Sequence, residues 1–345
     1  MKIERLLIVG LGSIGKKHLS IARSMYPEAK IMVLRHSKSN ETLQTVNFTV
    51  YNEKDAIDFN PQISIICTPS SQHVSIAMAL AKIGSHLLIE KPISNETINV
   101  RELVDYCKVH NRVLLIGYNL RYLGSLLYFK NQIDSGCIGK TLSVRCEVGQ
   151  YLPSWRKDTD YRTSVSANRR LGGGVLLELS HEIDYLRWIF GEIIWVRSTL
   201  AKLSSLETDV EDYANLTVGI MASKQSELII GNVIMDFFRH DDKRVCFAIG
   251  ELGTLMWDGI EDKVLKKLSN ESNWTTLFQG KRNREESYTQ EWKALTELVE
   301  NEKSEALSGD DGLAVLKIIE ATRKSAKKGR QINVKSPSIK KGIEN

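Results

Sequence analysis

The chain of 345 residues is long enough for two domains, each with its own hydrophobic core. Its 42% hydrophobic and 26% charged residues are typical of a globular protein rather than a disordered or fibrous one. The net charge of +5 is too small to demand nucleic acid, and no apolar run approaches the roughly 18 residues of a membrane span. We therefore expect neither nucleic acid nor a membrane as a partner.

The five cysteines are scattered along the chain, and none belongs to a C-x-x-C pair. This pattern favours reduced thiols over disulfides or a zinc site. The N-terminus shows no signal peptide, because the first predicted strand begins almost at once. We expect a cytoplasmic protein without a bound metal.

The first predicted strand, residues 6–9, leads directly into the motif G-x-G-x-x-G at Gly10, Gly12 and Gly15. Apolar residues then recur at a helical period, so the motif lies between a strand and a helix. In this setting the first glycine permits a tight turn, the second lets the backbone approach a pyrophosphate, and the third allows close helix packing. The motif predicts a dinucleotide site, which also includes Ser13 and Ile14.

A second interpretation of the same residues is a nucleoside-triphosphate loop. Gly10, Gly15 and Lys16 fit the frame G-x-x-x-x-G-K, which is normally followed by a Ser or Thr that holds magnesium. Position 17 is Lys, so we favour the dinucleotide.

The cofactor preference depends on the end of the next strand, residues 31–34. An acidic residue that binds the ribose hydroxyls of NAD is expected there, about 20 residues after the last glycine. The chain instead has Arg35, His36 and Ser37, which suit the 2′-phosphate of NADP. We favour NADP, and NAD remains the alternative.

Strands and helices alternate up to Gly117, which predicts right-handed crossovers on a parallel sheet. The expected strands are 31–34, 63–67, 86–89 and 113–116, with a short one at 48–51, and a helix is expected to begin at Asn95. Sites in such sheets lie beyond the carboxyl ends of the strands. We therefore assign to the cofactor site the following residues: Thr68, Pro69, His73, Glu90 and Lys91.

After Gly117 the pattern changes to a mostly antiparallel sheet with several helices. We expect helices at 125–134, 175–190, 285–301 and 310–327, and strands at 141–151, 193–203, 213–220, 226–236, 244–250, 253–257 and 263–268. The predicted fold is α/β: a Rossmann domain at 1–120 and a C-terminal α+β domain with an open sheet at 121–345.

Two positions are candidates for catalysis. Lys91 follows a strand and precedes Pro92, so it is either a residue of the cofactor cleft or a surface lysine. His181 has Glu178 at i−3 and Asp184 at i+3, which is consistent with proton exchange near neutral pH. The alternatives are an exposed helix face and, less favoured, a metal site.

These motifs together resemble the Gfo/Idh/MocA oxidoreductase family. The resemblance covers nearly the whole chain, through the glycine motif, Thr68-Pro69, Glu90-Lys91-Pro92, residues 117–122, Gly172-Gly173-Gly174 and His181-Glu182-Ile183-Asp184. It implies an NAD- or NADP-dependent enzyme for sugar-like substrates, with an open sheet that packs in homo-oligomers, dimers or tetramers.

The resemblance also implies residue roles. Lys91 matches a lysine near the nicotinamide, His181 the proton-transferring histidine, and Asp184 a substrate-binding aspartate. Many members have Asp four residues before the histidine, where this chain has Leu177, so Glu178 is the expected substitute.

The predicted loop 153–168 is rich in aromatic and basic residues, which suggests a negatively charged substrate such as a sugar acid or nucleotide-linked sugar of surface-glycan synthesis. We assign Trp155, Tyr161, Arg162 and Arg121 to substrate binding, and a solvated basic loop is the alternative. Two other functions stay open: a dinucleotide-binding regulator without catalysis, and a redox-neutral epimerase or glycosidase that retains its cofactor.

Overall fold

The computed structural model describes residues 2–37, 45–156, 159–222, 227–281, 283–301 and 308–334. The chain divides into two compact units: Met1–Asn119 with Tyr288–Leu313, and Leu120–Ser287 with Ala314–Asn345. The first break lies beside the boundary expected at 120. Residues 288–313, which we assigned to the second domain, belong to the first unit. Helical periodicity identifies an apolar face, but it does not identify the unit that this face covers.

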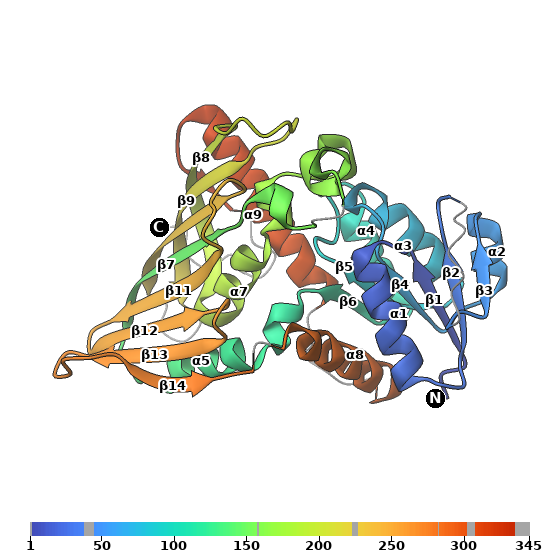
Figure 1. Ribbon diagram of the computed structural model, residues 1–345, viewed down its shortest axis with the longest axis horizontal. Coiled ribbons are helices and arrows are strands. Elements are labelled where there is room, and N and C mark those ends of the chain that lie inside the picture. The colour runs from blue at the N-terminus through green and yellow to red at the C-terminus, as the bar shows by residue number, and fades with distance from the viewer. Residues whose placement is uncertain are drawn as a thin grey trace. The chain divides into compact units, whose positions relative to one another are not determined.

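The first unit contains, in its described part, a six-stranded parallel sheet with the order β3-β2-β1-β4-β5-β6 (Figure 1). Its strands are β1 (Arg5–Val9), β2 (Lys30–Leu34), β3 (Phe48–Val50), β4 (Ile63–Ile66), β5 (His86–Glu90) and β6 (Leu114–Gly117). Strands β1, β4, β5 and β6 are almost continuously apolar and buried, as expected for a sheet covered on both faces.

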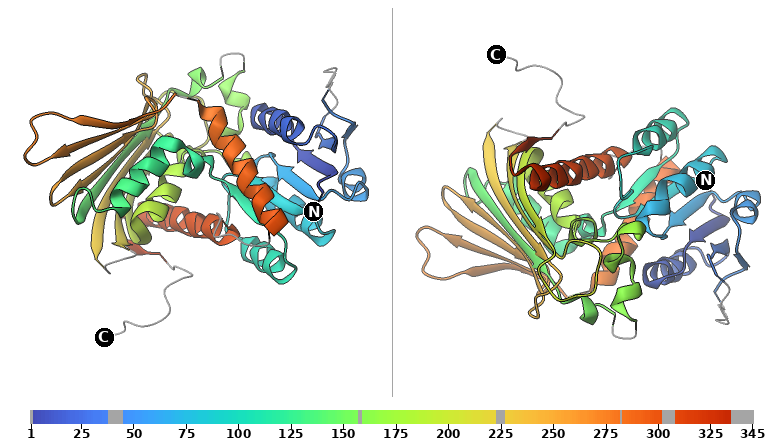
Figure 2. Two further views of the ribbon diagram at one scale, coloured as in Figure 1. Left: turned by 90° about the horizontal axis from the view of Figure 1, so that it is seen from below. Right: turned by 90° about the horizontal axis from the view of Figure 1, so that it is seen from above.

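Helices cover both faces of this sheet, and Figure 2 shows α1 and α4 on opposite sides of it. The helices are α1 (Ser13–Met25), α2 (Glu53–Asp58), α3 (His73–Lys82), α4 (Val100–Val109) and α8 (Arg284–Asn301). The helix expected from Asn95 begins only at Val100, after Asn99 in a left-handed conformation with φ of 59°. Ile98, within the segment expected to be helical, is 67% exposed. The left-handed residue interrupts any helix that passes through it.

The second unit contains a nine-stranded sheet with the order β14-β13-β12-β11-β7-β10-β9-β8-β15 among its described residues. Its strands are β7 (Thr141–Gly149), β8 (Gly191–Ala201), β9 (Tyr213–Ala222), β10 (Leu228–Asp236), β11 (Lys243–Gly250), β12 (Gly253–Asp258), β13 (Lys263–Leu268), β14 (Thr275–Gln279) and β15 (Ile332–Asn333). Strands β7 and β10 pair in parallel, and the other pairs are antiparallel. Strands β14 and β15 were not predicted from the sequence.

The helices of the second unit cover one face of this sheet and leave the other face open (Figure 2). They are α5 (Gly124–Asp134), α6 (Val175–Glu178), α7 (His181–Phe190) and most of α9 (Gly309–Lys328). The core under them includes Trp257, whose ring centroid lies 5.4 Å from that of Tyr185 and whose indole N–H donates to Ser125 Oγ at 2.9 Å. The packing anchors α5 and α7 on the sheet.

The helix expected at 175–190 is interrupted after Glu178. Leu179 and Ser180 lie between α6 and α7, so His181 begins a new helix. The apolar period continues across this interruption, which is why the sequence predicted one helix. The assumed common face of Glu178 and His181 is therefore not a property of one continuous helix.

Candidate functional site

The glycine motif forms a tight turn between β1 and α1 whose three glycines have distinct geometries. Gly10 has φ of +87°, a conformation that favours glycine. A Cβ atom on Gly15 would lie 2.1 Å from the Gly10 carbonyl oxygen, so a side chain there would push α1 away from the turn. A Cβ on Gly12 would meet nothing within 4 Å. The space at Gly12, at the start of α1, fits the approach of a pyrophosphate.

The carboxyl ends of the parallel strands bring the other predicted cofactor residues to the edge of the sheet where the glycine turn lies. Thr68 and Pro69 follow β4, Glu90 ends β5, and Lys91 comes next. The Lys91–Pro92 peptide bond is cis. The Thr68 hydroxyl oxygen is buried without a hydrogen-bond partner among the described residues, so it is an unsatisfied polar group at this edge of the sheet. These features fit a dinucleotide.

His73, a predicted cofactor residue, connects two loops at this edge of the sheet. Its ring is buried, with Nδ1 3.0 Å from the Pro92 carbonyl oxygen and Nε2 2.7 Å from that of Thr68. Burial is the largest influence on the pKa of this imidazole and lowers it, against the raising effect of the two carbonyls. The His73 ring thus joins the loop after β4 to the loop after β5.

The residues expected to select the cofactor follow β2. The main-chain N–H of Arg35 donates to the Val50 carbonyl at 2.9 Å, which continues the pairing of β2 with β3. The Arg35 side chain is half-buried, and His36 and Ser37 are exposed. These three side chains thus lie at the same strand-end edge as the glycine turn.

The candidate catalytic helices of the second unit contain a buried polar cluster. His181 is buried at the start of α7, and Glu178 is half-buried at the end of α6. Arg121 binds Asp184 with two hydrogen bonds, Nε to Oδ2 at 2.9 Å and Nη2 to Oδ1 at 2.6 Å. The two residues that we assigned separately to substrate therefore bind each other, as a bidentate pair that holds both side chains in place.

A second charged pair, beside His181, was not foreseen from the sequence. Glu182 is fully buried, and its carboxylate accepts from Arg244 Nε of β11 at 2.8 Å. Its place next to His181 was visible, but nothing local in the sequence identifies a partner on a strand 62 residues away. The pair holds the first turn of α7 against the sheet.

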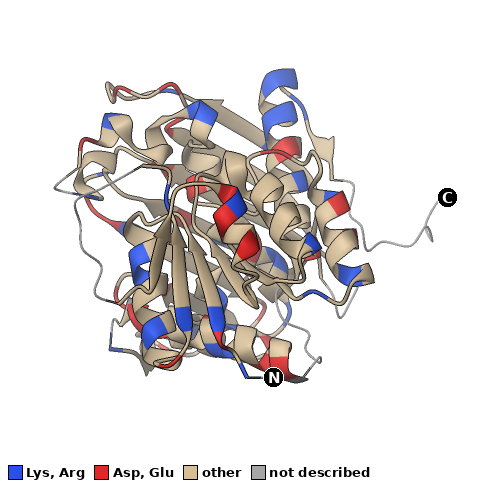
Figure 3. Ribbon diagram, turned by 90° about the vertical axis from the view of Figure 1, so that its right-hand side faces the viewer, with Lys and Arg blue, Asp and Glu red and all other residues tan. Residues whose placement is uncertain are grey.

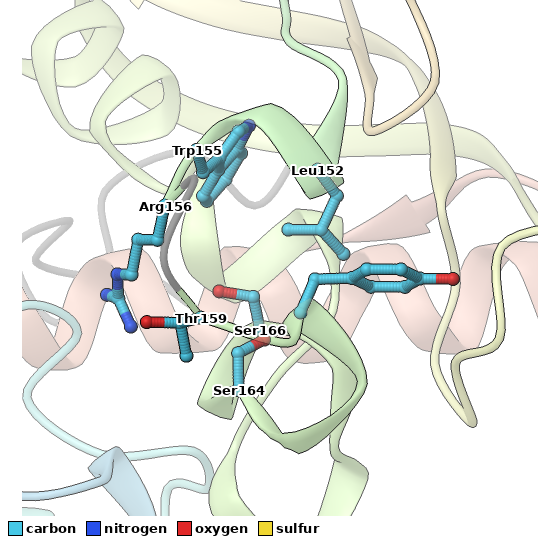
Figure 4. A pocket seen from close by; sticks show the side chains of 7 residues that line it. Leu152, Trp155, Arg156, Thr159, Ser164 and Ser166 are labelled. Carbon is cyan, nitrogen blue, oxygen red and sulfur yellow. The ribbon is translucent and has the colours of Figure 1, made fainter.

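Residues 152–156 and 159–171 border a hollow lined by Leu152, Trp155, Arg156, Thr159, Tyr161, Ser164 and Ser166. About 260 Å³ of empty space lies over these residues, and this volume includes open solvent, so the hollow is a shallow surface depression. Figure 4 shows Trp155 and Leu152 on one side, Ser164 and Ser166 across from them, and Arg156 and Thr159 together at one end. The hydroxyl of Ser164 is buried without a hydrogen-bond partner among the described residues.

Two of the predicted substrate residues in this loop are already engaged by the protein. Arg162 binds Asp160 through Nε and Nη2, at 2.9 and 2.8 Å, and lies 3.4 Å from Glu207. The hydroxyl of Tyr161 accepts from the main-chain N–H of Glu207 at 3.1 Å. Arg156, which belongs to the same basic cluster in the sequence, is the arginine that lines the hollow.

The hollow is connected to the catalytic helices through the glycine triplet. Gly174 N–H donates to the Ser166 carbonyl at 3.1 Å, and Gly173 N–H to that of Asn168 at 2.9 Å. A Cβ on Gly173 would lie 2.2 Å from the Val165 carbonyl oxygen. The triplet therefore lets the start of α6 pack directly on the backbone of the hollow.

Charged residues are otherwise distributed over the surface. Figure 3 shows acidic and basic residues interspersed on the side that it faces. Within the described part of the chain, His, Cys, Asp and Glu side chains form no group of three or more that could hold a metal ion. No helix in that part combines the length and the apolar character needed to cross a membrane.

Comparison with known sequences identifies the N-terminal and C-terminal domains of one family along the chain. Residues 4–118 match the oxidoreductase family with an NAD-binding Rossmann fold, and residues 126–254 match the GFO/IDH/MocA C-terminal domain. Myo-inositol 2-dehydrogenase of Thermotoga maritima is 23% identical over 341 residues, covering 96% of this chain and 98% of that protein. Levoglucosan dehydrogenase of Pseudarthrobacter phenanthrenivorans is 32% identical over 146 residues, covering 41% and 37%.

Solved structures share the fold over nearly the whole chain. Levoglucosan dehydrogenase in complex with NADH and levoglucosan has a TM-score of 0.82 at 20% identity, covering 97% of this chain and 100% of that one. The WlbA dehydrogenase from Bordetella pertussis, in complex with NADH and UDP-GlcNAcA, has a TM-score of 0.76 at 20% identity, covering 96% and 99%. The predicted fold class, a Rossmann domain plus a domain with an open, mostly antiparallel sheet, is confirmed.

Proposed function

Since this chain belongs to the GFO/IDH/MocA oxidoreductase family, we propose that it transfers a hydride between a nicotinamide dinucleotide and a CH–OH carbon of a sugar-like substrate. The observation that carries the proposal is the edge of the first sheet, where the glycine turn after β1 and Lys91 after β5 follow strands of the same parallel sheet. The similarity to inositol and levoglucosan dehydrogenases supports a polyol or sugar as the substrate class.

The hydride chemistry is supplied by the bound nicotinamide, and the chain supplies position and charge. We propose that the glycine turn holds the pyrophosphate and that Lys91 polarises the reacting hydroxyl or carbonyl oxygen. His181 then takes the hydroxyl proton or returns it. Asp184, held by Arg121, binds substrate hydroxyls, and Glu178 substitutes for the family aspartate, whose position Leu177 occupies.

We propose that the cofactor is NADP rather than NAD. Arg35 stands where an acid would bind the ribose hydroxyls of NAD, and its guanidinium suits a 2′-phosphate. The two structures compared above contain NADH, so this preference distinguishes the chain from them. Thermal shifts with equal concentrations of NADP and NAD compare the two affinities directly.

We propose that the substrate is acidic, as a sugar acid or a nucleotide-linked sugar is. The hollow combines Trp155, on which a sugar ring can pack, with buried serine hydroxyls and the cation of Arg156. An arginine binds a carboxylate or phosphate through two parallel hydrogen bonds. The similarity to the WlbA dehydrogenase, whose solved complex contains UDP-GlcNAcA, is in line with such a substrate.

A panel of neutral sugars, sugar acids and nucleotide-linked sugars, assayed with each cofactor by the absorbance of the reduced nicotinamide, tests these proposals. Lys91→Met should lower kcat by about a hundredfold, because it removes the group that stabilises the reacting oxygen. Lys82→Met, on the exposed end of α3, is the matched control and should keep wild-type turnover. Wild-type kinetics in Lys91→Met would contradict the assigned role.

The same panel tests the acidic substrate. Arg156→Ala should raise KM for an acidic substrate about tenfold or more, because a charged hydrogen-bonded partner is lost, and should leave neutral sugars unaffected. Arg170→Ala, another exposed arginine of the same loop, is the control. An equal change of KM for acidic and neutral substrates would show that Arg156 does not recognise the acidic group.

A further inference from the structure

A chain of buried side chains leads from α8 to the main chain at Lys91, entirely within the first unit. Trp292 of α8 donates its indole N–H to Nδ1 of His18 on α1 at 2.9 Å. Nε2 of the same ring lies 2.9 Å from Glu90 Oε1, at the end of β5. Trp292 and His18 are fully buried. Helices α8 and α1 and the end of β5, which are far apart in sequence, thus meet at Glu90, the residue that precedes Lys91.

The tautomer of His18 follows from the chemistry of its neighbours. An indole N–H can only donate a hydrogen bond, so His18 Nδ1 must accept and cannot carry a proton. The ring proton is therefore on Nε2, and it is donated to Glu90. The two contacts thus fix one tautomer and one orientation of the His18 ring.

Two hydrogen bonds, one from His18 and one from the main chain, hold the Glu90 carboxylate in place. Its second oxygen, Oε2, accepts the main-chain N–H of Lys91 at 3.1 Å. A Cβ atom on Gly117 of β6 would lie 3.1 Å from this same oxygen, so the carboxylate is packed against the neighbouring strand. Burial is the largest single influence on the pKa of Glu90 and raises it, but the hydrogen bonds and charges of His18 and Lys91 together outweigh burial, so the pKa is lowered overall.

The other titratable groups that face this cluster come from α8, β4 and α1. Glu291 of α8 is buried, and burial followed by the charge of Glu90 raises its pKa well above the usual range. Burial, then Glu90 and Glu291, raise the pKa of the Cys67 thiol after β4 in the same way. Tyr288 contacts His18 edge-on at 5.8 Å between ring centroids, and Lys17 Nζ lies 4.5 Å from the centroid of Tyr288. Of these three neighbouring acidic groups, Glu90 is the one whose pKa is lowered.

We propose that Trp292 and His18 are positioning residues for Lys91: the indole selects the tautomer of His18, and His18 holds the Glu90 carboxylate against the main-chain N–H of Lys91. The inference rests on the proposed function only through the role of Lys91. It predicts that turnover depends on two hydrogen bonds to which neither cofactor nor substrate contributes, because small displacements of a catalytic group are costly.

The ring nitrogens of His18 give a test that is independent of turnover. In ¹⁵N spectra of the full chain, with His18 assigned by its loss in His18→Gln, the wild type should show the Nε2–H tautomer, with Nδ1 as the accepting nitrogen. Trp292→Phe keeps an aromatic ring but removes the donor to Nδ1, so the ¹⁵N shifts of the ring should no longer report one fixed tautomer. A wild-type His18 with its proton on Nδ1 would overturn the inference.

Turnover separates positioning from mere packing. His18→Gln can still accept from Trp292 and donate to Glu90, whereas His18→Leu can do neither. We expect His18→Gln to keep most of kcat, and both His18→Leu and Trp292→Phe to lose about tenfold with the KM for the cofactor unchanged. Tyr26→Phe, which removes the hydrogen bond from Tyr26 to Thr296 of α8 but spares His18, is the control.

Equal kcat values in His18→Gln and His18→Leu, measured on folded protein, would show that the two hydrogen bonds do not position Lys91 and would overturn the inference. If no sugar-like substrate reacts with the wild type, the proposed function fails instead. The ¹⁵N spectra still decide whether Trp292 selects the tautomer of His18. The two failures are therefore distinguishable.

Discussion

Glu291 is a carboxyl group inside the first unit whose two oxygens have no hydrogen-bond partner among the described residues. A buried, unpaired carboxylate would be very costly, and a neutral acid is less so. Burial, and then the charge of Glu90, raise the pKa of Glu291 well above its usual value, so the folded protein holds this proton to a higher pH than the unfolded chain does. Glu90 and Glu291 lie in the same buried region but differ in their hydrogen bonds. Glu90 accepts from two donors, whereas Glu291 has none among the described residues.

Glu291→Gln should stabilise the protein at neutral pH. The unfolded chain releases the Glu291 proton above about pH 4.3, whereas the folded chain retains it, so wild-type stability falls as the pH rises past that value. Glutamine is neutral at every pH and avoids this loss. The Tm difference should be near zero at pH 4 and reach roughly 2 °C or more at pH 8. Thermal unfolding across this range measures it.

Glu286→Gln, on an exposed position of the same helix, is the matched control and should give no such pH dependence. A Tm difference that stays constant from pH 4 to 8 would contradict a proton retained on Glu291.

At the scale of elements, the glycines of the turn between β1 and α1 have different roles. Gly12 has φ of −72° and ψ of −169°, which an alanine adopts without strain. The space beside it is therefore not required by the fold. Gly15 is different, because its Cα lies against the Gly10 carbonyl. Gly12 is thus needed by the ligand, and Gly15 by the packing of α1.

Gly12→Ala should fold like the wild type but bind cofactor at least about tenfold more weakly, since its methyl group occupies the space of the pyrophosphate. Gly15→Ala should lower the Tm of the cofactor-free protein, because its Cβ would lie 2.1 Å from a backbone oxygen. Thermal unfolding without ligand and titration with reduced cofactor measure the two effects separately. Unchanged cofactor affinity in Gly12→Ala would contradict the binding site.

At the scale of the whole molecule, the open face of the second sheet supports our proposal of a homo-oligomer, a dimer or a tetramer. On β10, Leu228, Ile230 and Ile234 alternate with buried residues and are exposed to solvent. Trp195 of β8 lies over Gly219 of β9, and a Cβ atom on Gly219 would be 2.1 Å from the indole Nε1 of Trp195. A face of this kind is apolar enough to pack on a second copy of the chain.

Ile230→Asp combined with Ile234→Asp should shift the protein toward monomer in size-exclusion chromatography with light scattering, because two buried charges would oppose the interface. Val109→Asp replaces an exposed apolar residue outside this sheet, at the end of α4, and should not change the mass. A monomeric wild type would refute the oligomer, and an unaltered mass in the double variant would place its interface elsewhere.

The residues that the sequence located well are those whose role depends on local order. The glycine turn, the strand before Lys91 and the alternation of strands and helices all follow from spacing along a short segment. Parallel strands must present their carboxyl ends at one edge, so the grouping of Gly10, Thr68 and Lys91 could be foreseen. The interruption at Leu179–Ser180 and the late start of α4 could not, because the apolar period continues through both.

The sequence by itself thus determined the fold class, the family and the edge of the first sheet at which the cofactor is expected. These follow from periodicity and motif spacing, which are local properties of the chain. Only the tertiary structure decided the partners: Trp292 with His18 and Glu90, Arg121 with Asp184, and Arg156 rather than Arg162 at the hollow. A buried polar group needs a partner, but its own segment does not specify which distant residue supplies it. That choice is made when the elements pack.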